Sequence, residues 1–140
     1  MGKKAGRKPS EPSTTTGHLE GDKLLRTFAS ALARNLRAID IAARLGGDEF
    51  ALVLPETGEE AAEQFLRRLR VALLREMQTA EPPWDMTFSM GAVTVVDPSI
   101  SSEDLVRSAD IAMYQVKRNG KDGLCVTTLE PHAPTRAGVV

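Results

Sequence analysis

Apolar residues recur at steps of three and four in three separate stretches, the spacing typical of amphipathic helices. The first stretch begins at Asp22, the second runs from Thr57 to about Met77, and the third ends near Asn119. Thr57 and Glu60 have the spacing of a capping box at the start of the second helix. The apolar face of the first stretch consists of Leu24, Leu25, Phe28, Ala31, Leu32 and Leu36. We therefore expect three helices, each burying one face.

Short runs with the character of strands alternate with these helices. Residues 41–45 and 50–54 flank a glycine-rich turn and predict a hairpin. The alternating run 86–93 suits a strand with one buried face, and Gly91 within it predicts a close approach of another backbone. Residues 124–128 predict a last strand. The order helix, hairpin, helix, strand, helix, strand predicts an α/β sandwich with helices packed on a sheet.

Length and composition fit one modest globular domain. The chain has 140 residues, of which 41% are hydrophobic. Residues 1–16 hold four basic residues, two prolines and almost nothing apolar, so we expect a disordered basic leader. Residues 129–140 are expected to form a loose tail. Lysine and arginine number 18 against 19 acidic residues, a balance that argues against nucleic acid as a partner.

The remaining composition points to a cytoplasmic protein. Cys125 is the only cysteine, which excludes an internal disulfide and a cysteine-based zinc site and fits a reducing compartment. No apolar run approaches the roughly 20 residues that span a bilayer, so no membrane segment is expected in this chain.

The glycine-rich turn carries the clearest chemistry. Gly46 and Gly47 precede the adjacent carboxylates Asp48 and Glu49. Carboxylates this close repel one another unless a cation joins them, and magnesium typically takes one or two protein carboxylates together with water and phosphate oxygens. The glycines would let a phosphate approach the backbone. The alternative is a solvated hairpin turn, since Gly and Asp are common turn residues.

Several separated motifs resemble those of the GGDEF domain, the diguanylate cyclase family, from Gly17 to about Gly123. The five-residue motif is intact at residues 46–50. The other matching segments are Gly17-His18, Gly21-Asp22, Arg37-Ala38-Ile39-Asp40, Thr87-Phe88-Ser89-Met90-Gly91, Ala109-Asp110, Met113-Tyr114 and Lys117. The resemblance implies a nucleotidyl cyclase-like sandwich over residues 17–128, with helices packed on a mostly antiparallel sheet.

The resemblance also implies an activity. Members of this family condense two GTP molecules into cyclic di-GMP and pyrophosphate, with Mg2+ as cofactor and two copies of the domain facing each other. Gly46 and Gly47 would then lie against the GTP phosphates, and Asp48 would bind the metal. Glu49 would assist at the metal or activate the attacking 3′-hydroxyl.

Three more residues correspond to GTP-binding positions of the family. Asp22 would recognise the guanine edge, although its place before an apolar run also fits a helix N-cap. Lys117 would meet the terminal phosphates. Lys121 stands where the family usually has arginine, and its alternative is a solvated lysine at a helix end.

Arg37 and Asp40 match the inhibitory product site of the family, where an arginine fork holds cyclic di-GMP. Arg68 falls where a second arginine completes that site across a partner domain. Without the resemblance, Arg37 and Asp40 have the spacing of an ordinary helix-end ion pair, which contributes less than about 1 kcal/mol.

The resemblance fails ahead of Gly17. Ala5 stands at the metal-binding aspartate of the family's first strand, and Ser13 stands at its guanine-binding asparagine. We therefore expect an N-terminally truncated domain whose leader replaces that interior strand and leaves its neighbours partly unpaired. This departure keeps two alternatives open: a catalytically inactive module that binds cyclic di-GMP or GTP, and a non-functional fragment.

Overall fold

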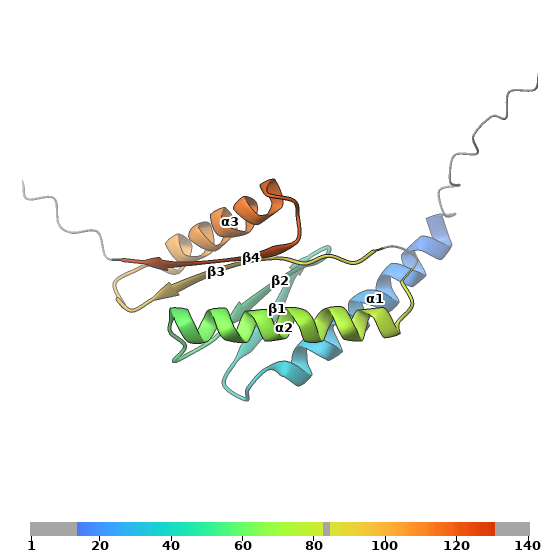
Figure 1. The fold of residues 1–140 in the computed structure, drawn as a ribbon, viewed down its shortest axis with the longest axis horizontal. Coiled ribbons are helices and arrows are strands. Elements are labelled where there is room, and N and C mark those ends of the chain that lie inside the picture. Colours follow the sequence, from blue (N-terminus) through green and yellow to red (C-terminus); the bar gives the residue numbers. More distant parts are fainter. Residues whose placement is uncertain (1–13, 83–84, 131–140) are drawn as a thin grey trace, which may run out of the picture.

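The chain forms helices and strands in the predicted order (Figure 1). The computed structural model describes residues 14–82 and 85–130. Its elements are α1 (Thr14–Asn35), β1 (Ile41–Gly46), β2 (Glu49–Val53), α2 (Glu59–Thr79), β3 (Ser89–Val95), α3 (Ser102–Arg118) and β4 (Gly123–Leu129). The α/β class expected from the pattern is therefore confirmed.

The first helix begins earlier than its apolar pattern indicates. It starts at Thr14, so residues 14–16 are helical and do not belong to a disordered leader. Asp22 lies inside the helix, so its interpretation as an N-cap is wrong. Residues 1–13, which include Ala5 and Ser13, lie outside the described residues, as do residues 131–140 of the expected tail.

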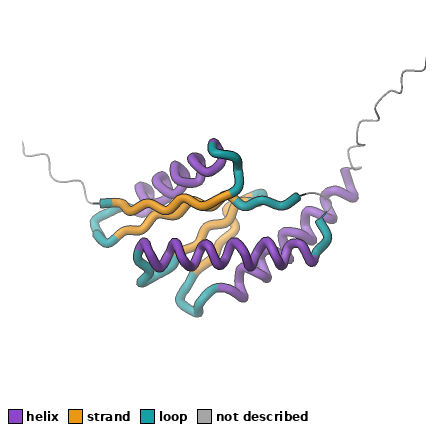
Figure 2. The backbone as a smooth tube through the Cα atoms, viewed as in Figure 1, coloured by secondary structure: helices purple, strands orange, loops and turns teal. Residues whose placement is uncertain are grey.

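The strands form two separate pairs (Figure 2). β1 and β2 are antiparallel, from Ile41 opposite Val53 to Gly46 opposite Glu49, with an irregularity between Arg44 and Gly46. β3 and β4 are parallel. Parallel neighbours need a crossover, which α3 supplies. One mostly antiparallel sheet was expected, and the described residues form one antiparallel and one parallel pair instead.

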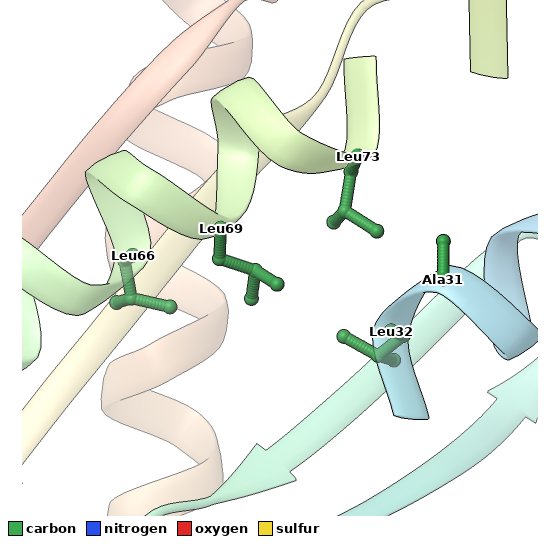
Figure 3. Close-up of a cluster of buried hydrophobic side chains, with 5 residues drawn as sticks. All are labelled: Ala31, Leu32, Leu66, Leu69 and Leu73. Carbon is green, nitrogen blue, oxygen red and sulfur yellow. The ribbon is translucent and has the colours of Figure 1, made fainter. Parts of the chain in front are cut away.

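Both pairs rest on the same helical core. Leu66, Leu69 and Leu73 of α2 meet Ala31 and Leu32 of α1 (Figure 3). Burial of a leucine side chain contributes about 1.5–3 kcal/mol, so this contact between the helices is a major source of stability. Half-buried residues of three strands cover the cluster, namely Phe50, Leu52, Met90, Ala92, Leu124 and Val126.

One predicted helix cap is absent. α2 has Gly58 as its N-cap residue, with no side-chain cap hydrogen bond. The Thr57 hydroxyl instead donates to the Pro55 carbonyl at 2.9 Å and accepts from Arg37, so it is not available to α2. The expected capping box of Thr57 and Glu60 was therefore wrong.

The close backbone approach expected at Gly91 is confirmed. A Cβ atom at this position would lie 2.2 Å from the backbone nitrogen of Met113 and 2.6 Å from the carbonyl oxygen of Ala109. α3 therefore lies directly against β3, at a distance that only glycine allows. This contact positions α3 at Ala109 and Met113, about one helical turn before Lys117.

Candidate functional site

The hairpin tip between β1 and β2 depends on its two glycines. Gly46 has a φ of 153° and Gly47 a φ of 54°, conformations that side chains rarely adopt. The Arg44 side chain donates from Nε to the Gly47 carbonyl at 2.8 Å and holds the turn. No heavy atom lies within 4 Å of a Cβ built on either glycine. The turn therefore presents open backbone to an approaching ligand.

Glu49 and Lys117 come together at this tip. Glu49 opens β2, and Lys117 lies in the last turn of α3. The Lys117 Nζ and Glu49 Oε1 atoms are 4.0 Å apart, and both side chains are about half exposed. Asp48 is exposed beside them and forms no hydrogen bond or ion pair with any described residue. Two candidate residues that are distant in sequence are thus neighbours in space.

The ion pair between Lys117 and Glu49 is weak. Exposed pairs of this kind contribute about 0–1 kcal/mol, because water screens them and ordering two long side chains costs entropy. A phosphate could therefore draw the lysine away from Glu49 at little cost, and a cation could likewise take the carboxylate. The site combines acidic and basic groups that each remain available to a ligand.

Asp48 and Glu49 fit a magnesium ion that arrives with a phosphate ligand. Among residues 14–82 and 85–130 there is no group of three His, Cys, Asp or Glu side chains that could enclose a metal. Magnesium does not need such a cage, since it often takes one or two protein carboxylates and fills its other positions with water and phosphate oxygens. The donor set thus suits a metal shared with a substrate.

The other two GTP-binding candidates are less closely connected to the tip. Lys121 lies in the turn after α3 with a φ of 62°, and its carbonyl accepts from the Ser89 hydroxyl at 2.9 Å. Its side chain is exposed near the end of α3. Asp22 is exposed on α1 and forms no hydrogen bond or ion pair within the described ranges. The structure records no contact that joins Asp22 to Glu49 or Lys117.

Arg37 and Asp40 form the ion pair that their spacing predicts. Arg37 Nη2 lies 3.0 Å from Asp40 Oδ1, and the backbone nitrogen of Arg37 donates to Oδ2 at 2.8 Å. Arg37 also donates to Thr57 Oγ1 at 2.7 Å and to the Pro55 carbonyl at 3.2 Å. These bonds join the end of α1 to the loop before α2.

The Asp40 carboxylate is fully covered, with 0% of its side chain exposed, while 51% of the Arg37 side chain is exposed. Hydrogen bonds from Arg37 hold the pKa of Asp40 below its ordinary value. The pKa of Arg37 is raised, chiefly by its hydrogen bond to Asp40. Arg68 lies exposed on α2 and forms no hydrogen bond or ion pair with either residue. A ligand at this site would have to compete with Asp40 for the arginine fork.

An ion pair between α2 and the loop before β4 was not predicted from the sequence. Arg70 of α2 pairs with Asp122, in the loop before β4. Asp122 also accepts from the backbone nitrogen of Phe88 at 3.4 Å, and the bond from Arg70 lowers the pKa of this carboxyl group. Arg70 resembles the other arginines on the polar face of α2, so its spacing carries no sign of this partner. The pair anchors the loop that contains Lys121.

The fold and the tip define an α/β domain whose candidate site suits phosphate and a divalent cation. The chain belongs to the GGDEF family, because the family model "Diguanylate cyclase, GGDEF domain" matches residues 12–123. The family assignment made from the motifs is therefore confirmed.

Relatives agree with this assignment. The chain is 40% identical over 109 residues to diguanylate cyclase DgcP of Pseudomonas aeruginosa, covering 77% of this chain and 16% of that protein. It is 34% identical over 113 residues to response regulator PleD of Caulobacter vibrioides, covering 79% and 25%. The chain thus spans a quarter or less of the length of these relatives.

The solved structure supports the fold. It is the GGDEF domain of DgcB from Caulobacter crescentus in complex with c-di-GMP, with a TM-score of 0.60 and 24% identity. The match covers 80% of this chain and 67% of that one. Within the described ranges, none of the helices combines the length and the hydropathy that a membrane span requires.

Proposed function

We propose that this chain is a diguanylate cyclase-type domain that condenses two GTP molecules into cyclic di-GMP and pyrophosphate in bacterial second-messenger signalling. The observation that carries the proposal is the meeting of Glu49 and Lys117 beside the open glycine turn. Relatives named diguanylate cyclase and membership of the family support it.

Each residue of the tip has a role in this reaction. Gly46 and Gly47 would leave room for the phosphates and Lys117 would neutralise the terminal ones, with Lys121, in the turn after α3, as a further candidate cation. Asp48 and Glu49 would hold Mg2+, which supplies further neutralisation of phosphate charge when bound. Asp22 would select guanine through hydrogen bonds from the base to its carboxylate.

The chemistry is a substitution at phosphorus. The 3′-hydroxyl oxygen of one GTP forms a bond to the α-phosphorus of the other, and the bond from that phosphorus to the bridging oxygen breaks. Pyrophosphate leaves with the electron pair, and Glu49 would help to remove the hydroxyl proton. A cyclic product needs this step twice. We therefore propose that two copies of the chain, each with one GTP, face each other during turnover.

A binding module is the second candidate function. The arginine fork of Arg37 suits a phosphate or a guanine edge of cyclic di-GMP, and Asp40 and Arg68 would complete such a site. The unmatched first strand favours this alternative, because Ala5 stands where the family has a metal-binding aspartate. The separation of the strands into two pairs favours the third possibility, a fragment without function.

Turnover is tested by incubating the purified chain with GTP and magnesium and measuring cyclic di-GMP by chromatography. We expect product from the wild type and a loss of at least about 100-fold in Asp48→Asn and in Glu49→Gln, the scale of losing a charged group that acts on the transition state. Glu63→Gln is the matched control, since Glu63 is a glutamate on α2 whose one ion-pair partner among the described residues is Arg67. Unchanged product in both tip variants would exclude the proposed roles.

Binding is measured in parallel with labelled cyclic di-GMP. Binding without turnover that disappears in Arg37→Ala, and persists in Arg67→Ala, would establish the binding module. Arg67 is a suitable control because it is another exposed arginine held by one carboxylate. Neither turnover nor binding, together with a broad unfolding transition, would identify a non-functional fragment.

A further inference from the structure

The turn after α3, residues 119–122, closes the end of that helix (Figure 1). The backbone N–H groups of Asn119 and Lys121 both donate to the carbonyl oxygen of Val116, at 3.1 and 3.2 Å. Lys121 has a φ of 62°, a conformation that is uncommon for residues other than glycine. Lys117 follows Val116 in the last helical turn of α3. The two lysines proposed to meet phosphate are therefore joined through one short piece of backbone, and a contact that holds this piece holds both.

A side chain from α2 reaches the turn. Arg70 pairs with the carboxylate of Asp122, the residue after Lys121. The same carboxylate accepts from the backbone nitrogen of Phe88 at 3.4 Å, and the Ser89 hydroxyl donates to the Lys121 carbonyl at 2.9 Å. The turn is thus connected to α2 by Arg70 and to the start of β3 by two further bonds.

The Arg70 side chain is largely covered. It is 25% exposed, against 67% for Arg67, which pairs with Glu63 on the same helix. Water screens a partly buried pair less than an exposed one, so Arg70 holds its partner more firmly. The Arg70 Nε atom is buried without a hydrogen-bond partner among the described residues, and such a donor costs stability. The position of Arg70 is therefore better explained by the turn that it holds than by a gain in stability.

We propose that Arg70 is a positioning residue for GTP binding. Through Asp122 it holds the turn after α3, and the turn in this place keeps Lys117 and Lys121 ready to meet the phosphates. Arg70 itself does not touch the substrate. The inference rests on the proposed function, since the lysines act on phosphate only if the chain binds GTP. It adds that phosphate affinity depends on a residue of α2, outside the hairpin tip.

The test compares Arg70→Gln with Arg67→Gln. The second variant is the matched control, because Arg67 is an arginine of the same helix that bonds to Glu63 and not to the turn. The ligand is a GTP analogue with a methylene bridge between the α- and β-phosphates, which cannot release pyrophosphate, and its affinity is measured by calorimetry with magnesium. We expect a loss of about tenfold in Arg70→Gln and a change of less than about twofold in Arg67→Gln.

Guanosine, titrated by NMR, distinguishes a positioning role from a general disturbance of the fold. It carries no phosphate, so its affinity should be the same in the wild type and in both variants. An equal loss of affinity for guanosine and for the analogue in Arg70→Gln would overturn the inference, because the change would then not be confined to the phosphate-binding lysines.

Asp122→Ala tests whether Arg70 acts through this carboxylate. The double variant Arg70→Gln with Asp122→Ala should bind the analogue as weakly as Arg70→Gln alone, because the two side chains act as one unit. Losses that add in the double variant would show instead that Arg70 acts on the ligand directly, and would overturn the positioning role.

Arg70→Lys provides a rescue by a conservative variant. It should bind the analogue more tightly than Arg70→Gln, because an ammonium group can still pair with Asp122, although it lacks the planar fork of arginine. Equal affinity in these two variants would contradict the ion pair as the cause. If Arg70→Gln did not fold, Arg70→Lys compared with Arg67→Lys would take its place, with a smaller loss expected in the same direction.

Failure of the inference and failure of the proposed function give different results. An affinity for the analogue that is unchanged in Arg70→Gln would overturn the role of Arg70 and leave the proposed function in place. A wild-type chain that does not bind the analogue would overturn the proposed function itself, and the role of Arg70 with it.

Discussion

Asp40 shows how one side chain can have two interpretations at the residue scale. The resemblance to the family assigns it to a product site, and its spacing from Arg37 predicts an ion pair. The structure shows the ion pair, with the carboxylate covered and the arginine bonded to the loop before α2. A product site built on Arg37 would therefore use a residue that already stabilises the chain.

The lowered pKa of Asp40 gives a pH-dependent prediction. Its folded pKa lies below the ordinary value of about 3.9, so its contribution to stability is complete above that value and is lost as the pH falls through the folded pKa. We expect Asp40→Asn to be less stable than the wild type at pH 7, with a smaller difference at about pH 3. Urea unfolding at both pH values measures it.

Asp85→Asn is the control for this prediction. Asp85 is exposed and its side chain forms no hydrogen bond or ion pair with the described residues. Its variant should therefore match the wild type at both pH values. A difference for Asp40→Asn that stayed constant from pH 7 to pH 3 would show that the charge of Asp40 does not contribute.

Exchanging the charges of Glu49 and Lys117 distinguishes their contribution to stability from their contribution to turnover. The double variant Glu49→Lys with Lys117→Glu keeps an exposed ion pair, so its unfolding free energy should stay within about 0.5 kcal/mol of the wild type. Turnover should stay as low as in the single variants Glu49→Lys and Lys117→Glu, because the carboxylate would no longer face the metal and the lysine would no longer face the phosphates. Recovery of cyclic di-GMP production by the double variant would show that Glu49 and Lys117 act only through their ion pair and not on a ligand.

At the scale of elements, Gly91 determines how α3 packs on β3. Gly91→Ala should destabilise the chain by about 3 kcal/mol, because its Cβ would meet backbone atoms that cannot rotate away. Gly21→Ala is the matched control in α1, where no heavy atom lies within 4 Å of the added Cβ. It should stabilise the chain by about 0.5–1 kcal/mol, as glycine is unfavourable inside a helix. Urea unfolding of both variants measures the contrast, and a neutral Gly91→Ala would refute the close packing.

Element types could be predicted from the sequence because they depend on local patterns. The apolar periodicity predicted α2 and α3, and the glycine-rich turn predicted the hairpin. Gly91 predicted the close approach of another backbone, which is that of α3. The start of α1 was missed because residues 14–16 are threonines, which carry no apolar periodicity. The cap of α2 was missed because Thr57 bonds to Arg37, a partner 20 positions away.

At the scale of the whole molecule, contacts between distant segments were beyond sequence patterns. The family resemblance placed Glu49 and Lys117 in one site, but no spacing within the chain shows that α3 carries the lysine to the hairpin. The pair of Arg70 and Asp122 has no sequence signal, since Arg70 is one of several arginines on α2. The division into two strand pairs likewise depends on which strand edges meet in space. The unmatched first strand had indicated only that some strands would be partly unpaired.

The shared helical core predicts that the two strand pairs unfold together. Leu69 is 2% exposed and belongs to the cluster on which both pairs rest. Leu69→Ala should lower the unfolding free energy by about 2–5 kcal/mol, because it removes buried methyl groups and leaves a cavity. Amide signals from β1–β2 and from β3–β4 should then disappear at the same, lower urea concentration.

Val71→Ala is the control on the same helix, where the valine is 53% exposed and outside the cluster. Its effect should stay within about 0.5 kcal/mol. Separate urea midpoints for the two strand pairs would contradict a common core, because each pair would then have its own source of stability. Within the described residues, no hydrogen bond between strands connects the β1–β2 pair with the β3–β4 pair. A single midpoint that shifts in Leu69→Ala and not in Val71→Ala would therefore show that α1 and α2 hold both pairs.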